Sequence, residues 1–334
     1  MSAVQPTAAA SGRPLPEPAQ PIPRSPAAPD PADHVDWRRV GLFYGIALGG
    51  AAVVAAGLWA LGGLGTPLAQ LVVALVYMMT PIVAGLVVER RAGRGLLLGG
   101  EWRVLGAGVG RTLGRIAGWS ALVALAVFTV QVACALGFGA LGVPGAGHWA
   151  TDAEFTARLR AVQPTLPDGV VLNAWPLVAA SAVQALLVGG TINGVLAFGE
   201  EYGWRGVLAD LLRPLGVVRA NLLIGVAWGL WHAPIIRLGH NYGAAWLPGI
   251  GLMVLWCVPL AFVLAWARER ARSVAAPAVV HGAFNGFVGI FTLAIAGANP
   301  LVALPVGVLA PVPLAIVAAT LWLAWPPGGR PQRP

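Results

Sequence analysis

The sequence predicts an all-α, polytopic membrane protein with about eight transmembrane helices. Hydrophobic residues make up 57% of the 334-residue chain, whereas charged residues make up only 10%. Apolar stretches long enough to cross a bilayer recur along the chain. Because the hydrocarbon core offers the backbone no hydrogen-bonding partner, these stretches are expected to be helices. The net charge of +8, carried by arginine without lysine, is then explained by membrane topology, and no nucleic-acid partner is expected.

The chain divides into a tail, a membrane domain and a second, short tail. Residues 1–36 are rich in Pro, Ala and Ser and hold no apolar core, which predicts a disordered cytoplasmic tail rather than a signal peptide. Residues 37–325 form the predicted membrane domain, which begins with an interfacial aromatic and basic cluster, Trp37, Arg38 and Arg39. Residues 326–334 are a short basic tail.

The predicted spans follow one another along the membrane domain. A kink is expected in the second span at Pro81. A polar segment between the third and fourth spans predicts a short helix at 152–162, and prolines break the last span. The predicted spans are 40–64, 68–88, 116–139, a long segment 175–212, 220–236, 247–267, 274–296 and 301–325.

The arginines indicate how these spans are oriented. If the N-terminus lies in the cytoplasm, all arginines except Arg158, Arg160 and Arg237 fall on the cytoplasmic side or in the span that leads to it. An excess of arginine on the cytoplasmic side is typical of membrane proteins. The sequence therefore predicts a multi-pass protein of the cell membrane with both termini in the cytoplasm.

One charged motif interrupts the apolar sequence, Glu200-Glu201-Tyr202-Gly203-Trp204-Arg205. Ionisable side chains inside a membrane are costly and are usually functional. In a helix, Glu201 and Arg205 are four residues apart and share a face, so they can neutralise each other. Glu200 points about 100° away from Glu201 and is left without a local partner.

Two later spans carry polar residues at matching positions. Glu200 lies 16 residues before Gly216, at the predicted turn, and His232 lies 16 residues after it, so the two are expected at similar depth. His281 and Asn285 are four residues apart on a span that starts from the same side. Together these residues supply a general base, imidazoles and an amide donor, the parts that activate water and stabilise an oxyanion.

A structural explanation exists for each of these residues taken alone. A single His or Asn within a membrane is often an interhelical hydrogen-bonding group. The pair of Glu201 and Arg205 is interpreted as a mainly structural pair that positions Glu200. Trp228, four residues before His232, is interpreted as a packing residue. The convergence of three spans on one cavity favours function over packing.

The three motifs, taken in order, resemble the signature of the CPBP intramembrane proteases. That family includes the type II CAAX prenyl endopeptidases and bacteriocin-processing or immunity proteins of the Abi type. The resemblance covers about 181–297, with Trp228 where the family usually has Phe. It implies that Glu200 and His232 activate water and that His281 and Asn285 bind the oxyanion.

The resemblance leaves the metal question open. Glu200, His232 and His281 would make a His₂Glu zinc set with water as the fourth ligand. Alternatively, Glu200 and His232 bind the catalytic water directly, and this metal-free glutamate mechanism is slightly favoured. No His-Glu-x-x-His motif is present.

The function predicted on these grounds is hydrolysis of peptide bonds in a membrane-embedded or lipid-anchored protein or peptide. The rival is a non-catalytic membrane transporter, or an immunity or binding protein, that uses the same polar cluster, because intramembrane Glu, His and Arg also mark proton-coupled transport. The spans show no clear inverted repeat, a feature of many transporters, which favours the protease.

Overall fold

The structure is a computed structural model that describes residues 34–93, 96–97, 101 and 108–326. The tails predicted at 1–36 and 326–334 lie almost wholly outside the described residues. The part between them is helical, apart from a two-stranded antiparallel ribbon of β1 (His148–Trp149) and β2 (Ile295–Ala296). The helices are α1 Trp37–Ala60, α2 Pro67–Val72, α3 Thr80–Arg91, α5 Val109–Ala140, α6 Asp152–Val162, α7 Ala174–Gly189, α8 Ile192–Glu201, α9 Ala209–Leu212, α10 Gly216–Trp231, α11 Ala233–Arg237, α12 Trp246–Ala271, α13 Ala275–Leu293 and α14 Pro311–Ala324. Short π-helical segments, η2 (Val73–Tyr77) and η3 (Tyr202–Leu208), and 3₁₀ turns, η4 (Arg213–Leu215) and η5 (Gly243–Ala245), join some of them.

The predicted class, an all-α membrane protein, is confirmed. Within the described residues, five helical segments are long and apolar enough to cross a membrane, and a bent pair would add a sixth. The pair joins Ala174–Gly189 to Ile192–Arg237 at an angle of 59°. The five segments are Trp37–Ala60, Pro67–Arg91, Val109–Ala140, Gly243–Ala271 and Ala275–Leu293.

The eight spans of the prediction are therefore not all present as long helices. α14 has only 14 residues, about 21 Å at 1.5 Å per residue, which is shorter than the hydrocarbon core. The predicted eighth span was to start at residue 301, but turns occupy 301–310 and Pro311 stands in the first turn of α14. Proline suits the first turn of a helix and not its interior, so Pro305, Pro311 and Pro313 shorten this span.

Two other predicted elements differ in detail. α5 begins at Val109, before the predicted start at 116, so Arg115 lies on the helix, where its Nε donates to the Ala271 carbonyl at 2.7 Å. The predicted kink at Pro81 appears as an irregular stretch just before it, because η2 and a turn separate α2 from α3.

The short helix predicted at 152–162 is confirmed as α6, with the same bounds. It begins with a capping box, in which the Thr151 side chain accepts from the Glu154 amide and the Glu154 side chain accepts from the Thr151 amide.

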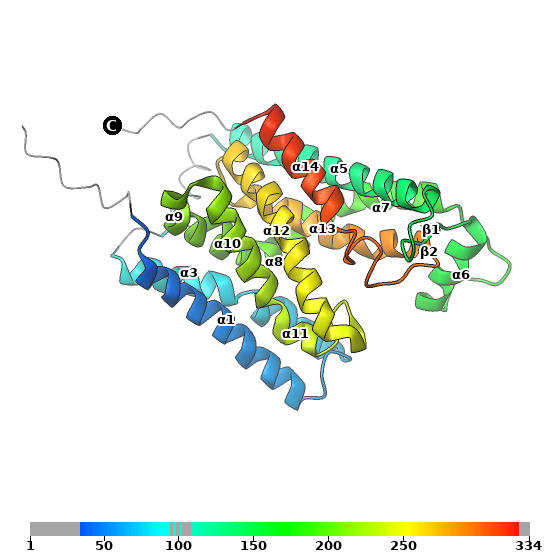
Figure 1. The fold of residues 1–334 in the computed structure, drawn as a ribbon, viewed down its shortest axis with the longest axis horizontal. Coiled ribbons are helices and arrows are strands. Elements are labelled where there is room, and N and C mark those ends of the chain that lie inside the picture. The colour runs from blue at the N-terminus through cyan, green and yellow to red at the C-terminus, as the bar shows by residue number, and fades with distance from the viewer. Residues whose placement is uncertain (1–33, 94–95, 98–100, 102–107, 327–334) are drawn as a thin grey trace, which may run out of the picture. The chain divides into compact units, whose positions relative to one another are not determined.

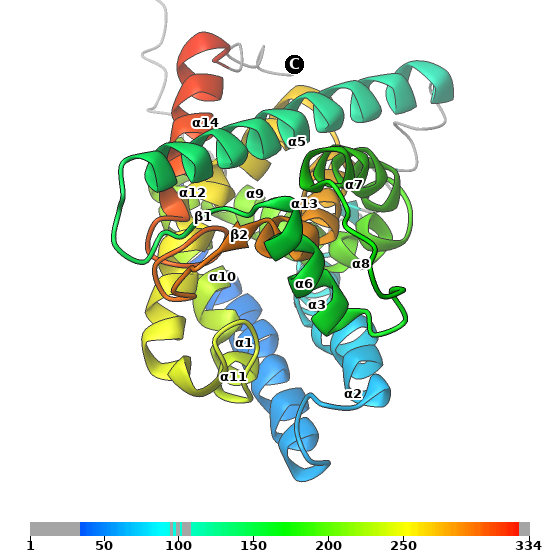
Figure 2. The ribbon, with the colours of Figure 1, turned by 90° about the vertical axis from the view of Figure 1, so that its right-hand side faces the viewer.

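Small residues let the helices around the centre approach closely. A Cβ atom on Gly229 of α10 would lie 2.5 Å from the Val254 Cα of α12. A Cβ atom on Gly282 of α13 would lie 2.6 Å from the Gly194 amide nitrogen of α8. Such small-residue contacts are typical of packed helices in membranes. Figure 2 shows the result, with α13 beside α7 and α8.

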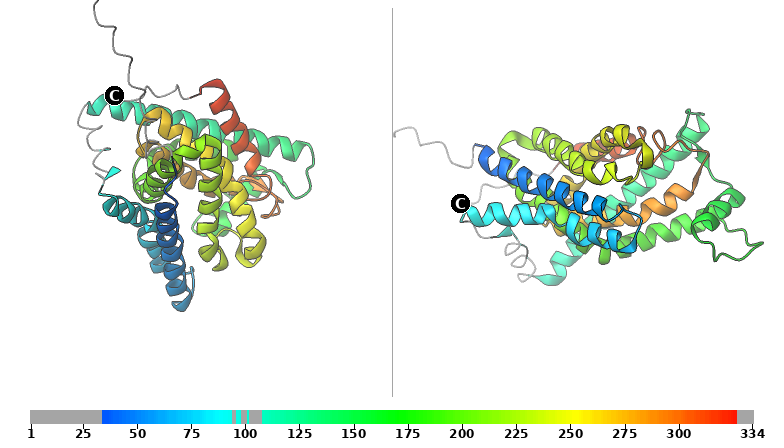
Figure 3. Two further views of the ribbon diagram at one scale, coloured as in Figure 1. Left: turned by 60° about the vertical axis from the view of Figure 1, so that its left-hand side comes forward. Right: turned by 90° about the horizontal axis from the view of Figure 1, so that it is seen from below.

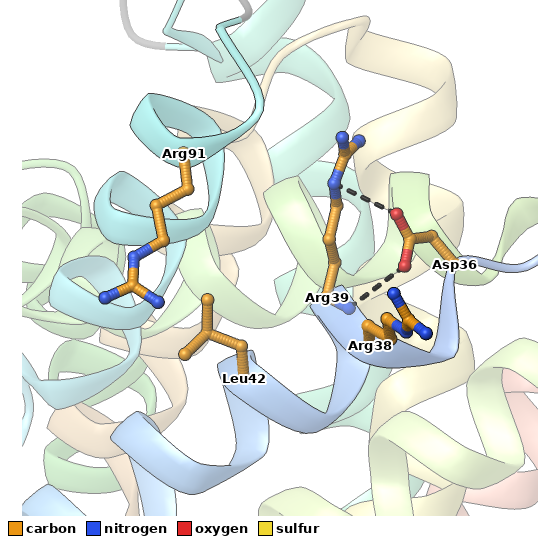
Figure 4. Close-up of a pocket in the computed structure, with 5 residues that line it drawn as sticks. All are labelled: Asp36, Arg38, Arg39, Leu42 and Arg91. Atoms are coloured by element: carbon orange, nitrogen blue, oxygen red, sulfur yellow. Dashed lines mark hydrogen bonds and ion pairs between the residues drawn. The ribbon is translucent and has the colours of Figure 1, made fainter.

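The two ends of the helices differ in charge. At one end, called the basic end here, α1 begins and α3 ends, and the two helices run side by side (Figure 1 and Figure 3). Asp36, Arg38, Arg39 and Leu42 from the start of α1 line an open pocket with Arg91 from the end of α3 (Figure 4). The turn before α10 and the end of α12 lie at the same end (Figure 1).

The opposite end holds α6 and the β1–β2 ribbon (Figure 1). Arg158 of α6 donates to the carbonyl oxygens of Leu293 and Thr292, both at 3.1 Å, where α13 ends. The placement of this arginine away from the basic end agrees with the charge asymmetry that the sequence predicts.

Candidate active site

The two adjacent glutamates lie at the junction of α8 and η3. Glu200 is 3% exposed and Glu201 is 0% exposed, so both carboxyl groups are withdrawn from the surface. Here the backbone changes from an α-helix to a π-helix, an irregularity that often occurs at functional sites. The side chains that follow the pair therefore do not keep the regular α-helical spacing.

Glycines on either side of the glutamates allow the second predicted span to pack closely against the segment that carries them. A Cβ atom on Gly199 would lie 2.4 Å from the Met79 side chain, and one on Gly203 would lie 2.5 Å from the Pro81 carbonyl oxygen. A larger residue at Gly203 would push the two segments apart because it meets the Pro81 backbone, whereas the Met79 side chain beside Gly199 is flexible. The irregular stretch before α3 and the irregular segment η3 thus pack directly against each other.

The predicted pair of Glu201 and Arg205 is confirmed. Arg205 Nη1 donates to Glu201 Oε1 at 3.0 Å, and both side chains are almost fully buried. His281 Nδ1 lies 2.9 Å from the same oxygen. Because a carboxylate only accepts, Nδ1 is the donor, and Nε2 of His281 remains for another partner. Glu201 is therefore the partner of His281 as well as of Arg205, a contact that spacing within one helix could not reveal.

Glu200 has a partner that the sequence interpretation missed. Trp228 Nε1 donates to Glu200 Oε2 at 2.8 Å, and the Trp228 side chain is 0% exposed. Because a buried indole N–H usually has an acceptor, the sequence could have indicated that Trp228 needs a polar partner. Trp228 is therefore more than the packing residue that the sequence predicts. The other oxygen, Oε1, makes no hydrogen bond with any described residue.

His232 lies immediately after α10, and its ring is fixed by that helix. Its Nδ1 donates to the Trp228 carbonyl at 2.8 Å, which leaves Nε2 as the acceptor of a neutral imidazole. The end of α10 is tied to the second span, because Trp231 Nε1 donates to Thr80 Oγ1 at 2.9 Å and the Tyr77 hydroxyl donates to the Trp231 carbonyl. His232 is half-buried.

Trp228 lies at the centre of these groups. Its ring centroid is 5.8 Å from that of His232 and 5.3 Å from that of His281. The guanidinium carbon of Arg205 is 4.0 Å from the Trp228 centroid, a cation–π contact. One indole thus touches the groups from all three motifs, and its N–H holds Glu200 among them.

Asn285 is the predicted site residue that stands apart. It lies on α13 four residues after His281 and is exposed. Its side chain makes no hydrogen bond with the residues that the structure describes. The structure therefore brings Glu200, Glu201, Arg205, His232 and His281 together around Trp228 and leaves Asn285 at the edge.

The alternative zinc set of Glu200, His232 and His281 is not assembled by these positions. Across the described part of the chain, no three His, Cys, Asp or Glu side chains are placed so that they could hold a metal ion. Glu200 is instead held by an indole and His281 by a carboxylate. The residues as placed do not fit a His₂Glu site.

Comparison with known proteins points to one family. Residues 174–287 match the family model described as type II CAAX prenyl endopeptidase Rce1-like. A CAAX prenyl protease 2 from Methanococcus maripaludis is 28% identical over 94 residues, which are 26% of this chain and 34% of that protein. The chain thus covers about a third of the length of the curated relative that it matches. The part of the chain that carries the candidate site is thus similar to the Rce1-like type II CAAX prenyl endopeptidases.

Proposed function

We propose that this protein is an intramembrane endopeptidase that hydrolyses peptide bonds of membrane-embedded or lipid-anchored proteins. The observation that carries the proposal is the buried carboxylate of Glu200, held through one oxygen by Trp228 and placed with two imidazoles around the same indole. The similarity of residues 174–287 to the type II CAAX prenyl endopeptidases supports the same reaction. The relative's printed name, CAAX prenyl protease 2, makes a lipid-anchored C-terminal peptide one substrate to test.

In the proposed reaction, Glu200 and His232 bind the attacking water. Glu200 Oε1 and His232 Nε2 are available as acceptors, because the hydrogen bonds with Trp228 use the other polar atom of each side chain. Glu200 takes one proton as the water oxygen adds to the carbonyl carbon of the substrate. The same proton then moves to the amide nitrogen as the carbon–nitrogen bond breaks, so that a carboxylic acid and an amine leave.

The tetrahedral intermediate carries a negative oxygen that needs donors. His281 supplies one through Nε2 when its ring is protonated at both nitrogens. Glu201 accepts from Nδ1 and balances the charge of that imidazolium. Asn285, one turn further along α13, is the proposed second donor, and its exposed side chain is free to reach a bound peptide.

The membrane arrangement proposed with this function keeps both termini in the cytoplasm and eight crossings, five by the long helices and three by the short or bent segments. This arrangement would open the site toward the side of the basic end.

The proposal is tested by cleavage in reconstituted vesicles. Purified protein and a set of membrane-anchored peptides, with and without a prenylated C-terminus, are incubated, and new peptide termini are identified by mass spectrometry. New termini with the wild type and none with Glu200→Gln are expected. If the wild type produces no new termini but moves a proton or solute across the sealed vesicles, the transporter alternative is correct instead.

A further inference from the structure

A cavity lies at the basic end beside the candidate active site. It has a volume of about 240 Å³ and is lined by residues of α9, α10, α12 and α14 and of the turn before α10. Its outer part is formed by exposed residues, among them Arg213 and Val217. Its inner part reaches buried Ile224 and Arg205. The cavity therefore leads from the surface to the side of Arg205, the partner of Glu201.

The lining combines apolar walls with three arginines, Arg205, Arg213 and Arg268, and two carboxylates, Asp210 and Glu269. Val217, Ala220, Ile224, Ala265 and Trp322 supply the apolar surface. Of the charged residues, Asp210 is already bound by Arg268, whose Nη2 lies 3.0 Å from both carboxylate oxygens. Arg213 forms no ion pair or hydrogen bond with the part of the chain that the structure describes.

Arg205 brings unused donors to the inner end. Its side chain is 1% exposed, and only Nη1 is used, by Glu201. Nε and Nη2 are buried and have no hydrogen-bond partner among the described residues. A buried donor that lacks a partner is costly, and a guanidinium presents its N–H groups in a fork that suits carboxylate and phosphate. An anion that enters the cavity would reach these donors after a small displacement of the side chains that cover them.

We propose that this cavity binds the anionic end of an amphiphile, a carboxylate or phosphate that carries an apolar chain. The charged end binds Arg205 and Arg213, and the chain lies along Val217 and Trp322 toward the mouth. At roughly 30 Å³ per water, the cavity holds the head and a few methylene groups, so the rest of the chain extends into the lipid. Because the same guanidinium holds Glu201, and Glu201 holds His281, binding would alter the candidate active site. That consequence rests on the proposed function, whereas the binding itself does not.

The experiment uses the purified full chain in an uncharged maltoside detergent and a photoreactive, diazirine-bearing fatty acid as the probe. After illumination, labelled peptides are located by mass spectrometry. Four competitors distinguish the contribution of the charged group from that of the apolar chain: oleate, phosphatidylglycerol, oleyl alcohol and inorganic phosphate. Arg213→Gln removes the exposed cation of the cavity. Its matched control is Arg219→Gln, an exposed arginine of the same region that does not line the cavity.

The expected label lies on 217–224 and near Trp322, and oleate or phosphatidylglycerol displaces it. The stronger of these two identifies the charged group as carboxylate or phosphate. Oleyl alcohol and inorganic phosphate should each be at least about tenfold weaker, and Arg213→Gln should weaken probe binding about tenfold, because a hydrogen bond to a charged group is lost. Arg219→Gln should bind as the wild type does.

Four results would overturn the proposal. One is label spread over lipid-facing helices with no concentration at the cavity. Another is equal loss in Arg213→Gln and Arg219→Gln, which would indicate general surface charge. The third is displacement by oleyl alcohol or by phosphate alone as strong as that by oleate and phosphatidylglycerol. Ala265→Phe, which fills the cavity without changing charge, should also abolish the label, and unchanged labelling of this variant would contradict the site. None of these readings requires peptide cleavage, so they are independent of the proposed function.

Discussion

At the scale of single residues, the candidate site depends on one indole. Trp228 holds Glu200 through its N–H, lies between two imidazoles and receives the guanidinium of Arg205 on its ring. The sequence allowed the pair of Glu201 and Arg205 to be predicted, because four-residue spacing in a helix is a local rule. The contacts of Glu200 with Trp228 and of Glu201 with His281 cross between helices, and no local rule supplies them.

Replacing the indole by a ring without the N–H tests this arrangement. Trp228→Phe removes the donor to Glu200 Oε2 and leaves a buried acceptor with one partner fewer, which typically costs about 1–3 kcal/mol. We expect a lower melting temperature in detergent. Trp256→Phe is the matched control, because the Trp256 indole N–H is buried without a partner among the described residues. An equal loss of stability in both variants would mean that the hydrogen bond to Glu200 contributes nothing.

The buried ion pair makes a second prediction at this scale. Arg205→Ala leaves the Glu201 carboxylate buried with only His281, and breaking a buried pair on one side typically costs about 3–5 kcal/mol. Thermal unfolding should therefore shift strongly downward. The double variant Glu201→Gln with Arg205→Met removes both charges and should recover part of that loss. A double variant less stable than Arg205→Ala would contradict this assignment of the pair.

At the scale of elements, the site is positioned by irregular helices that pack through glycine. The junction of α8 and η3 lies against the interrupted second span, and a Cβ atom on Gly203 would lie 2.5 Å from the Pro81 carbonyl oxygen. The sequence predicted α6 with its exact bounds because its cap and length are local properties. It missed η2 and η3, because a π-helix arises from tertiary packing that hydrophobic patterns do not record. The length of the last span was predicted too large, because prolines limit α14 to 14 residues.

Alanine substitutions test this packing. Gly203→Ala places a methyl group about where the Pro81 carbonyl lies, so the second span must shift away from η3. We expect lower stability and lower activity together. Gly57→Ala in α1 is the control, because nothing lies within 4 Å of a Cβ atom there, and Ala favours the helix over Gly by about 1 kcal/mol. If Gly203→Ala behaves like Gly57→Ala in both measurements, the close approach has been wrongly assigned.

At the scale of the whole molecule, the sequence predicted the class correctly and the number of spans only in part. Hydropathy identifies long apolar segments, and five are found in the described residues. It does not tell how a bent segment such as α7–α8 or a short helix such as α14 lies in the bilayer. The positions of such segments depend on the helices around them, because irregular backbone within a membrane is tolerated where protein covers it.

The proposed topology is checked with reporters on both termini. If the chain crosses eight times, reporters at the N-terminus and at the C-terminus are active on the same, cytoplasmic side, as the arginine asymmetry predicts. A cysteine introduced at Asp168, in the segment after α6, should react with a membrane-impermeant thiol reagent from outside. A C-terminal reporter that is active only outside the cytoplasm would contradict eight crossings.

The central claim, that Glu200 is the general base of a peptidase, is tested most directly by Glu200→Gln measured for rate and stability together. The amide keeps the size of the side chain and can still accept from Trp228 Nε1, but it cannot take a proton from water. Loss of general-base catalysis typically lowers the rate about 10²–10⁴-fold, while the melting temperature should stay close to that of the wild type. A variant that keeps its specific activity and loses stability would contradict the account, because Glu200 would then be a structural residue.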